Sequence, residues 1–138
     1  MVVDIKDGAL AYSSEVAKEM SPTAYATAMN DNSAYKSAID KIKEAGIYAI
    51  GRIVVFNDVH YGKDHPEDCI SSKASNRLWP SAYSRNVWYY NVELAKEAAR
   101  EMGFNEIQFD YVRFPENAYN LSVAKADFKN KYDEEKAE

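Results

Sequence analysis

Ionisable and polar residues gather at the ends of three short segments that are rich in β-branched and aromatic residues. These residues are Asp4, Lys6, Asp7, Arg52, Asp58, Gln108, Asp110, Tyr111 and Arg113. Two carboxylates that flank a glycosidic bond, roughly 5 to 9.5 Å from each other, can hydrolyse it. We therefore predict Asp110 as a catalytic carboxylate, for which the sequence alone names no partner. The other residues of the set are predicted to bind substrate.

Strand alternation predicts which of these side chains share a site, because residues two apart on a strand point to the same side of a sheet. The polar residues expected on one face are Asp4, Lys6, Arg52, Gln108 and Asp110. The apolar residues expected on the other face, against helices, are Ile5, Ile53, Ile107 and Phe109. Charged groups of both signs on one face must pair with each other or with a ligand. A purely internal network of ion pairs is therefore the alternative interpretation.

Three strands and two helices are expected to hold these residues in place. The strands are predicted near residues 2–6, 48–56 and 105–110, and apolar residues recur at helical spacing in 33–45 and 84–102. Gly46 and Gly103 follow the two predicted helices, as glycine often does at a helix C-terminus. Such alternation predicts parallel, adjacent strands in chain order, joined by right-handed crossovers.

Two α/β folds use such crossovers, the doubly wound sheet and the (β/α)8 barrel. A doubly wound sheet normally holds phosphate in a glycine-rich turn, and the sequence contains neither G-x-G-x-x-G nor G-x-x-x-x-G-K-[ST]. We therefore predict an α/β fold that is a partial (β/α)8 TIM barrel over residues 1–122, followed by a charged, helical tail over 123–138. A complete barrel takes about 250 residues, so we expect this chain to be a fragment.

The composition argues against several kinds of partner. The formal net charge is -5 and Lys and Arg form no dense run, so neither nucleic acid nor a membrane is an expected partner. Cys69 is the single cysteine, and His60 and His65 lie in an acidic loop without an H-E-x-x-H motif. No metal site and no cofactor is therefore predicted. The expected partner is a carbohydrate, because 11 Tyr and 2 Trp supply many amphipathic rings.

The two tryptophans are predicted to differ in role. Trp79 lies in a long polar loop near a strand end, where its indole can stack on a sugar ring or pack against the loop. We predict it as a substrate-binding residue. Trp88 lies in the helix before the third strand and is expected in the core.

Residues 103–115, GFNEIQFDYVRFP, resemble the signature of a bacterial family of glycosyl hydrolases with a TIM-barrel fold. Residues 2–7 and 47–58 are similar to the second and third strands of that family, so the chain is expected to span strands two to four. The resemblance implies hydrolysis of an oligo- or polysaccharide by carboxylates at the C-terminal strand ends. It also implies an extracellular or cell-envelope location, although no signal peptide precedes the first predicted strand.

The same family is similar to α-amylase-like barrels, in which an Asp at the end of the fourth strand is the nucleophile and an Arg lies two residues before it. The resemblance therefore implies that Asp110 is the nucleophile. Gln108 occupies the position of that Arg, which makes the electrostatics of the site different.

A non-catalytic carbohydrate-binding or scaffold barrel domain is the alternative function. A metal-dependent hydrolase ranks below both, because neither histidine lies at a clear strand end. A partial barrel exposes strand edges and an apolar inner face. We therefore expect the chain to self-associate or to pair with the missing half of the barrel, and a fragment of this kind need not be active by itself.

Overall fold

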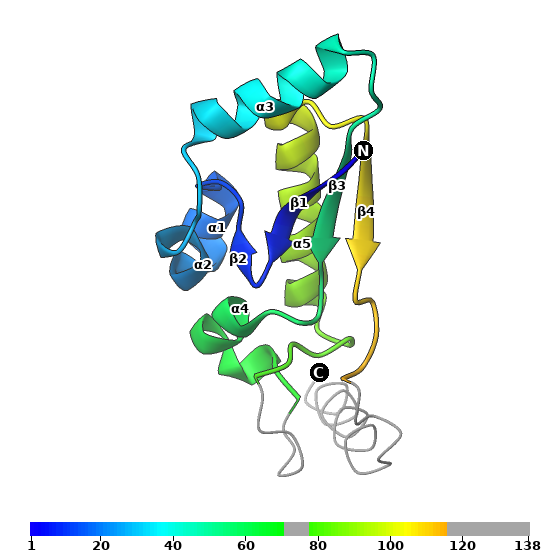
Figure 1. Ribbon diagram of the computed structural model, residues 1–138. Coiled ribbons are helices and arrows are strands. Elements are labelled where there is room, and N and C mark those ends of the chain that lie inside the picture. Colours follow the sequence, from blue (N-terminus) through cyan, green and yellow to red (C-terminus); the bar gives the residue numbers. More distant parts are fainter. Residues whose placement is uncertain (71–77, 116–138) are drawn as a thin grey trace.

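The computed structural model describes residues 1–70 and 78–115, and in these residues one four-stranded sheet has the order β2-β1-β3-β4 (Figure 1). The strands are β1 (Val2–Asp7), β2 (Ala9–Leu10), β3 (Ile50–Val54) and β4 (Glu106–Asp110). The α-helices are α1 (Glu15–Met20), α2 (Pro22–Ala26), α3 (Asn32–Glu44), α4 (Val59–Asp64) and α5 (Arg85–Glu97). A short 3-10 helix, η1 (Pro66–Asp68), follows α4, and a π-helical turn, η2 (Ala98–Met102), continues α5.

The predicted parallel order of the strands is confirmed. Strand β1 pairs with β3 and β3 pairs with β4, both in parallel. The two predicted helices are present as α3 and as α5 with η2, and Gly46 and Gly103 follow them with φ of 77° and 82°. Ser84 begins α5, since its side chain accepts a hydrogen bond from the amide of Val87. The chain is therefore a mixed α/β protein with a three-stranded parallel sheet.

Several short elements in the connections were not predicted. After β1 the chain turns at Gly8 and returns as β2, antiparallel to β1, before α1 and α2 follow. The long connection after β3 contains α4 and η1. The predicted tail over residues 123–138 lies outside the described residues. None of the helices in the described part of the chain is long and apolar enough to span a membrane.

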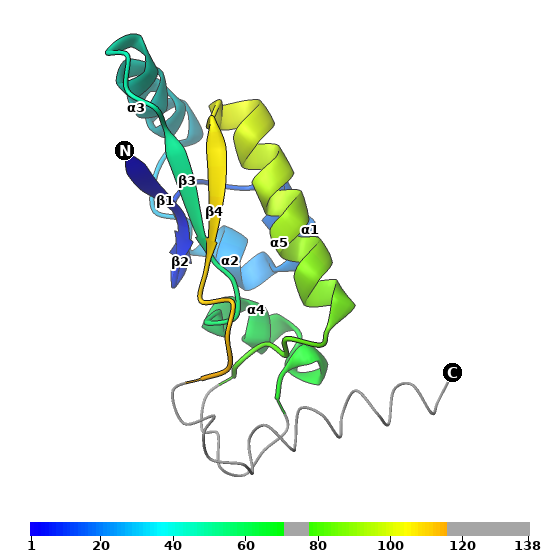
Figure 2. The same cartoon turned by 90° about the vertical axis from the view of Figure 1, so that its right-hand side faces the viewer.

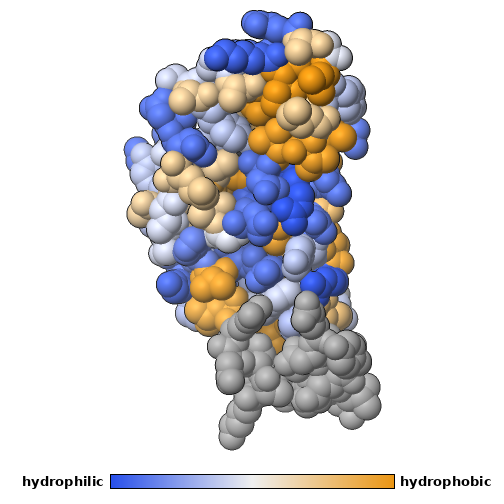
Figure 3. Space-filling model, in the orientation of Figure 1, coloured by the Kyte–Doolittle hydropathy of each residue, from blue (hydrophilic) through white to orange (hydrophobic). Residues whose placement is uncertain are grey.

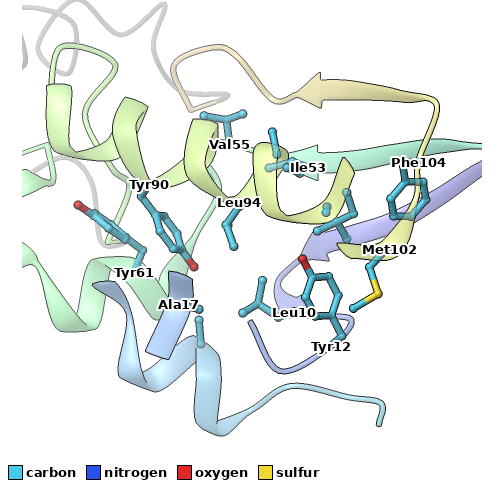
Figure 4. Packing of buried hydrophobic residues seen from close by; sticks show 14 of the residues in the cluster. Leu10, Tyr12, Ala17, Ile53, Val55, Tyr61, Tyr90, Leu94, Met102 and Phe104 are labelled. Carbon is cyan, nitrogen blue, oxygen red and sulfur yellow. The ribbon is translucent and has the colours of Figure 1, made fainter. Parts of the chain in front are cut away.

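Helix α5 runs along one face of the sheet, and α3 crosses the amino-terminal end of the strands (Figure 2). The core forms between α5, the sheet and the connection that carries α1 and α2 (Figure 4). Tyr90 and Leu94 of α5 pack there with Ile53 of β3 and with Leu10 and Ala17 from the first connection. Burial of these side chains supplies the main free energy of folding, at roughly 25 cal/mol per Å² of apolar surface.

The opposite face of the sheet faces the viewer in Figures 1 and 3. Arg52 lies on this face, because the next residue of β3, Ile53, points into the core. Figure 3 shows an apolar area over the amino-terminal ends of the strands and a hydrophilic band toward their carboxyl ends. Exposed residues at the amino-terminal end include Met1, Val2 and Ile47. In the described residues, no helix lies along this face as α5 lies along the other.

The prediction that Trp88 belongs to the core was wrong. Trp88 is 48% exposed, because it lies on the outer side of α5, and its indole N–H donates to the Ala82 carbonyl. Phe109 is in register with buried Ile53, on the face where the prediction placed it. It is nevertheless 44% exposed, because β4 is the last strand of the described sheet and no described helix covers its outer side. Phe109 therefore adds exposed apolar surface at the last strand of the described sheet.

Candidate active site

One guanidinium group holds three carboxylates on the open face of the sheet. Arg52, on β3, donates from Nη1 to Asp4 Oδ1 at 2.8 Å and to Asp7 Oδ2 at 3.2 Å. Its Nε donates to Asp110 Oδ2 on β4 at 2.8 Å. The prediction that Asp4, Arg52 and Asp110 share one face is confirmed. We call these four residues the Arg52 cluster.

The Arg52 cluster is open to solvent and carries excess negative charge. The aspartate side chains are 40% to 52% exposed, whereas that of Arg52 is 20% exposed. Hydrogen bonds to Asp4, Asp110 and Asp7 raise the pKa of Arg52, so this group stays a cation. The hydrogen bond from Arg52 and a second one from the Tyr111 amide hold the pKa of Asp110 below its usual range. Asp110 is thus kept as an anion.

The chain bends sharply at the carboxyl end of β4. Tyr111 has φ of 52°, a left-handed conformation that non-glycine residues rarely adopt. In this conformation its amide donates to Asp110 Oδ1 at 2.7 Å. The guanidinium of Arg113 lies 4.6 Å from the centre of the Tyr111 ring and 5.9 Å from that of Trp79. Backbone strain of this kind concentrates at functional sites.

The chain matches the model of one protein family along its whole length. A family model described as a putative glycosyl hydrolase domain, DUF4015, matches residues 1–138. The chain belongs to this glycosyl hydrolase domain family. The match supports a general glycoside-hydrolase-like function, but it identifies neither a substrate nor a catalytic residue.

Among solved structures, this glycosyl hydrolase domain is similar to a hypothetical protein from Ruminiclostridium thermocellum ATCC 27405. The two share 28% sequence identity, and the match covers 94% of this chain and 73% of the other, with a TM-score of 0.69. No curated protein matches the chain.

Lys6 of the glycosyl hydrolase domain does not face the Arg52 cluster, and the prediction that it shares a face with Asp4 was wrong. A bulge lies between Asp4 and Lys6, so that Ile5 and Lys6 are both buried on the helix side. Lys6 Nζ donates to Asp58 Oδ2 and to Asn91 Oδ1 of α5, both at 2.7 Å. Burial lowers the pKa of Lys6, and the ion pair with Asp58 opposes that shift.

Asp58 and Trp79 were predicted to bind substrate, but both side chains are buried in the glycosyl hydrolase domain. Asp58 is 2% exposed, pairs with Lys6 and caps α4 by accepting from the Tyr61 amide. Trp79 is 3% exposed and belongs to the core, because the backbone of Ile70 pairs with its carbonyl and holds this segment inward. Neither residue offers a surface to a ligand in this structure.

Gln108 lies where the prediction placed it, exposed on the open face of the sheet. In the parallel register it pairs with Arg52, so it flanks the Arg52 cluster from β4. The polar residues that the structure brings together at the strand ends are thus Asp4, Asp7, Arg52, Gln108, Asp110, Tyr111 and Arg113.

Sequence reasoning missed a junction between the first and second connections. Asp64, at the end of α4, accepts hydrogen bonds from the Ser21 hydroxyl and from the amide and hydroxyl of Thr23 at the start of α2. His65 places Nε2 against the Met20 carbonyl at the end of α1. No sequence spacing links these residues, since the contacts span more than 40 positions.

His65, Glu67 and Asp68 also place potential metal-ligand atoms within 4.8 Å of one another. Those atoms already have protein partners. His65 bonds to Met20 and Glu67, and Asp68 accepts from the hydroxyls of Tyr61 and Ser84. We therefore assign these three residues a structural role, in which they hold together the junction between the first and second connections and the start of α5.

Proposed function

We propose that the protein is a glycoside hydrolase that cleaves an oligo- or polysaccharide, with Asp110 as the catalytic nucleophile. One observation carries the proposal. Asp110 lies at the carboxyl end of β4 on the open face, and the Arg52 guanidinium and the Tyr111 amide hold it as an anion. An anionic carboxylate that is fixed by two donors can attack an anomeric carbon or stabilise an oxocarbenium-like transition state.

An arginine contacts the proposed nucleophile here, as in α-amylase-like barrels, but it comes from a different strand. In those barrels the nucleophile is accompanied by an Arg two residues before it on the same strand. Gln108 has that position here, and Arg52 lies beside it in register on β3. A guanidinium group would thus still reach the nucleophile, but from the neighbouring strand. Arg52 would therefore supply the positive charge that Gln108 lacks.

The open face of the sheet supports the proposal that the chain is part of a (β/α)8 barrel. In a barrel the helices cover the outer face of the strands, and the active site lies at their carboxyl ends. Helix α5 covers one face, and the Arg52 cluster lies toward the carboxyl ends of the strands on the other. Further strands would close the barrel around Asp110 and shield the reaction from water.

Substitution of Asp110 by Asn in the full-length protein tests the function. Asn keeps the shape of the side chain but can neither carry the negative charge nor form a glycosyl ester. We expect glycan hydrolysis to fall by several orders of magnitude, with circular dichroism and thermal unfolding nearly unchanged. Asp40→Asn is the matched control, because Asp40 is an exposed aspartate on α3 that pairs only with Lys36 among described residues.

Two results would contradict this proposal. A wild-type protein that cleaves no glycan over a broad panel would favour the carbohydrate-binding or scaffold function. A D110N variant that keeps nearly full activity on a cleaved glycan would make Asp110 a structural partner of Arg52.

A further inference from the structure

The bulge in β1 changes which side chain reaches the active site. Asp4 pairs with Arg52, but the next paired residue of β1 is Lys6, opposite Ile53, so one residue is inserted between them. Without the bulge, Ile5 would pair with Ile53 and Lys6 would follow on the open face. A bulge of this kind re-aims the side chains that follow it, and bulges often lie next to active sites.

The register then brings Asp7 level with Asp110. Ile53 is paired with Lys6 on one side and with Phe109 on the other. One residue further along, Val54 pairs with Asp110 on β4, and continuing the β1 register by one residue sets Asp7 on the other side of Val54. The contact between Asp7 and Arg52 places Asp7 on the open face.

Lys6, the first paired residue after the bulge, is fixed on the opposite side of the sheet by its own partners. Lys6 is 2% exposed and bonds to Asp58 after β3 and to Asn91 on α5, and its ammonium lies 5.1 Å from the centre of the Tyr90 ring. Removal of one partner from a buried ion pair is costly, because it leaves the other charge buried and unpaired. The pair therefore holds Lys6 away from the site and Asp7 within it.

We propose that Asp7 is a specificity-determining residue that accepts hydrogen bonds from ring hydroxyls of the sugar unit whose anomeric carbon lies at Asp110. The inference depends on the proposed function and adds the class of substrate. An ionised carboxylate only accepts hydrogen bonds, so it recognises free hydroxyl groups. An acidic sugar would add another anion beside three aspartates that share Arg52. The preferred unit is therefore a neutral sugar with unsubstituted hydroxyls.

The test compares the full-length wild type with Asp7→Ala on one aryl glycoside that the wild type cleaves and on its monodeoxy analogues. A hydrogen bond to a charged group corresponds to about a 10- to 100-fold effect on kcat/KM. For the wild type, we expect kcat/KM on at least one deoxy analogue to be lower than on the parent glycoside by that factor. For the D7A variant, kcat/KM on the parent glycoside should already be lower by the same factor. Removal of that one hydroxyl from the substrate should then cause no further decrease in the kcat/KM of D7A. Asp7→Asn, whose amide oxygen still accepts, should recover part of the loss.

Asp40→Ala is the matched control, because Asp40 is an exposed aspartate on α3 that pairs with Lys36 and lies outside the Arg52 cluster. This variant should discriminate among the analogues as the wild type does. If D7A also keeps the wild-type discrimination, the inference is wrong while the hydrolase proposal stands. If the wild type cleaves no glycoside, the proposed function fails and the inference fails with it. Circular dichroism of each variant separates these results from misfolding.

Discussion

At the scale of single residues, the Arg52 cluster contributes more to the charge state of Asp110 than to stability. Exposed ion pairs contribute only about 0 to 1 kcal/mol each, because water screens them. All three aspartates of the Arg52 cluster are 40% exposed or more. The physical effect of Arg52 is instead to favour the ionised form of Asp110, which a nucleophile requires.

Substitution of Arg52 by Gln should therefore shift the pH dependence of the reaction. Loss of the cation raises the pKa of Asp110 from its lowered value, so the acid limb of the kcat/KM profile should move to higher pH. Carboxyl carbon NMR of Asp110 in the same variant should show the same displacement. Arg52→Lys should move the limb less, since Lys keeps the charge. An unchanged acid limb and an unchanged NMR titration in R52Q would contradict this role.

Alternation along strands was sufficient to predict that Asp4, Arg52 and Asp110 lie together. It failed for Lys6, because the argument assumes a regular strand and a bulge leaves no mark in the spacing of residues. One residue in the sequence could have indicated that Lys6 is buried. Asn91 is a polar residue on the buried side of α5, one position after Tyr90, and a buried amide needs a partner. Its side-chain N–H donates to the Val87 carbonyl, and its Oδ1 accepts from Lys6.

At the scale of elements, length explains which parts of the fold could be predicted. Helices α3 and α5 have 13 residues each, which is long enough for a helical period to stand out. Helices α1, α2 and α4 have 6, 5 and 6 residues, and β2 has 2. Their positions depend on contacts between connections, such as that of Asp64 with Thr23, and short isolated helices are unstable.

The junction between these short helices should respond to pH through His65. Nε2 lies against the Met20 carbonyl and Nδ1 lies 3.2 Å from Glu67 Oε1. Both partners are acceptors, so only the imidazolium can donate to both. Burial of the ring opposes its charge, but the hydrogen bonds to Met20 and Glu67 outweigh it and raise the pKa of His65. The junction therefore favours protonated His65.

The sign of the pH effect follows from this raised pKa. The contribution of His65 to stability is fully present below its unfolded pKa of about 6.5 and is lost as pH rises through the higher folded value. Asp64 has a lowered pKa, so its contribution is lost only as pH falls through that acidic value. We expect the thermal midpoint of the wild type to decrease above about pH 6.5, and this decrease to be absent in His65→Gln. Parallel midpoint curves for the two proteins would disprove the role of His65.

At the scale of the whole molecule, the sheet has one covered face and one open face. The predicted α/β class is confirmed, whereas closure into a barrel depends on strands that residues 1–70 and 78–115 do not include. Phe109 and Val112, which are 44% and 63% exposed, lie on β4 and just beyond it. An exposed strand edge beside apolar side chains is a typical surface for pairing with another strand.

We therefore expect the 138-residue chain to self-associate through this edge. Sedimentation velocity over a range of concentrations should show species larger than the monomer. Replacement of both Phe109 and Val112 by Lys should shift the distribution to the monomer, since charge at a strand edge opposes pairing. Val59→Lys is the control, because Val59 is an exposed apolar residue on α4, outside the sheet. A wild-type chain that stays monomeric at high concentration would contradict the expectation.

The two edges of the sheet are not equivalent, and this limits the symmetry of any assembly. The edge beyond β2 is already occupied, because the amides of Met29 and Asn30 donate to the carbonyls of Leu10 and Ala11. On the other side of the sheet, no described strand pairs with the outer side of β4, so a second copy can join there. A two-fold axis there would set the two β4 strands antiparallel and would use the free edge of both copies. Assembly through the β4 edge alone should then end at a closed dimer and not grow into a fibre.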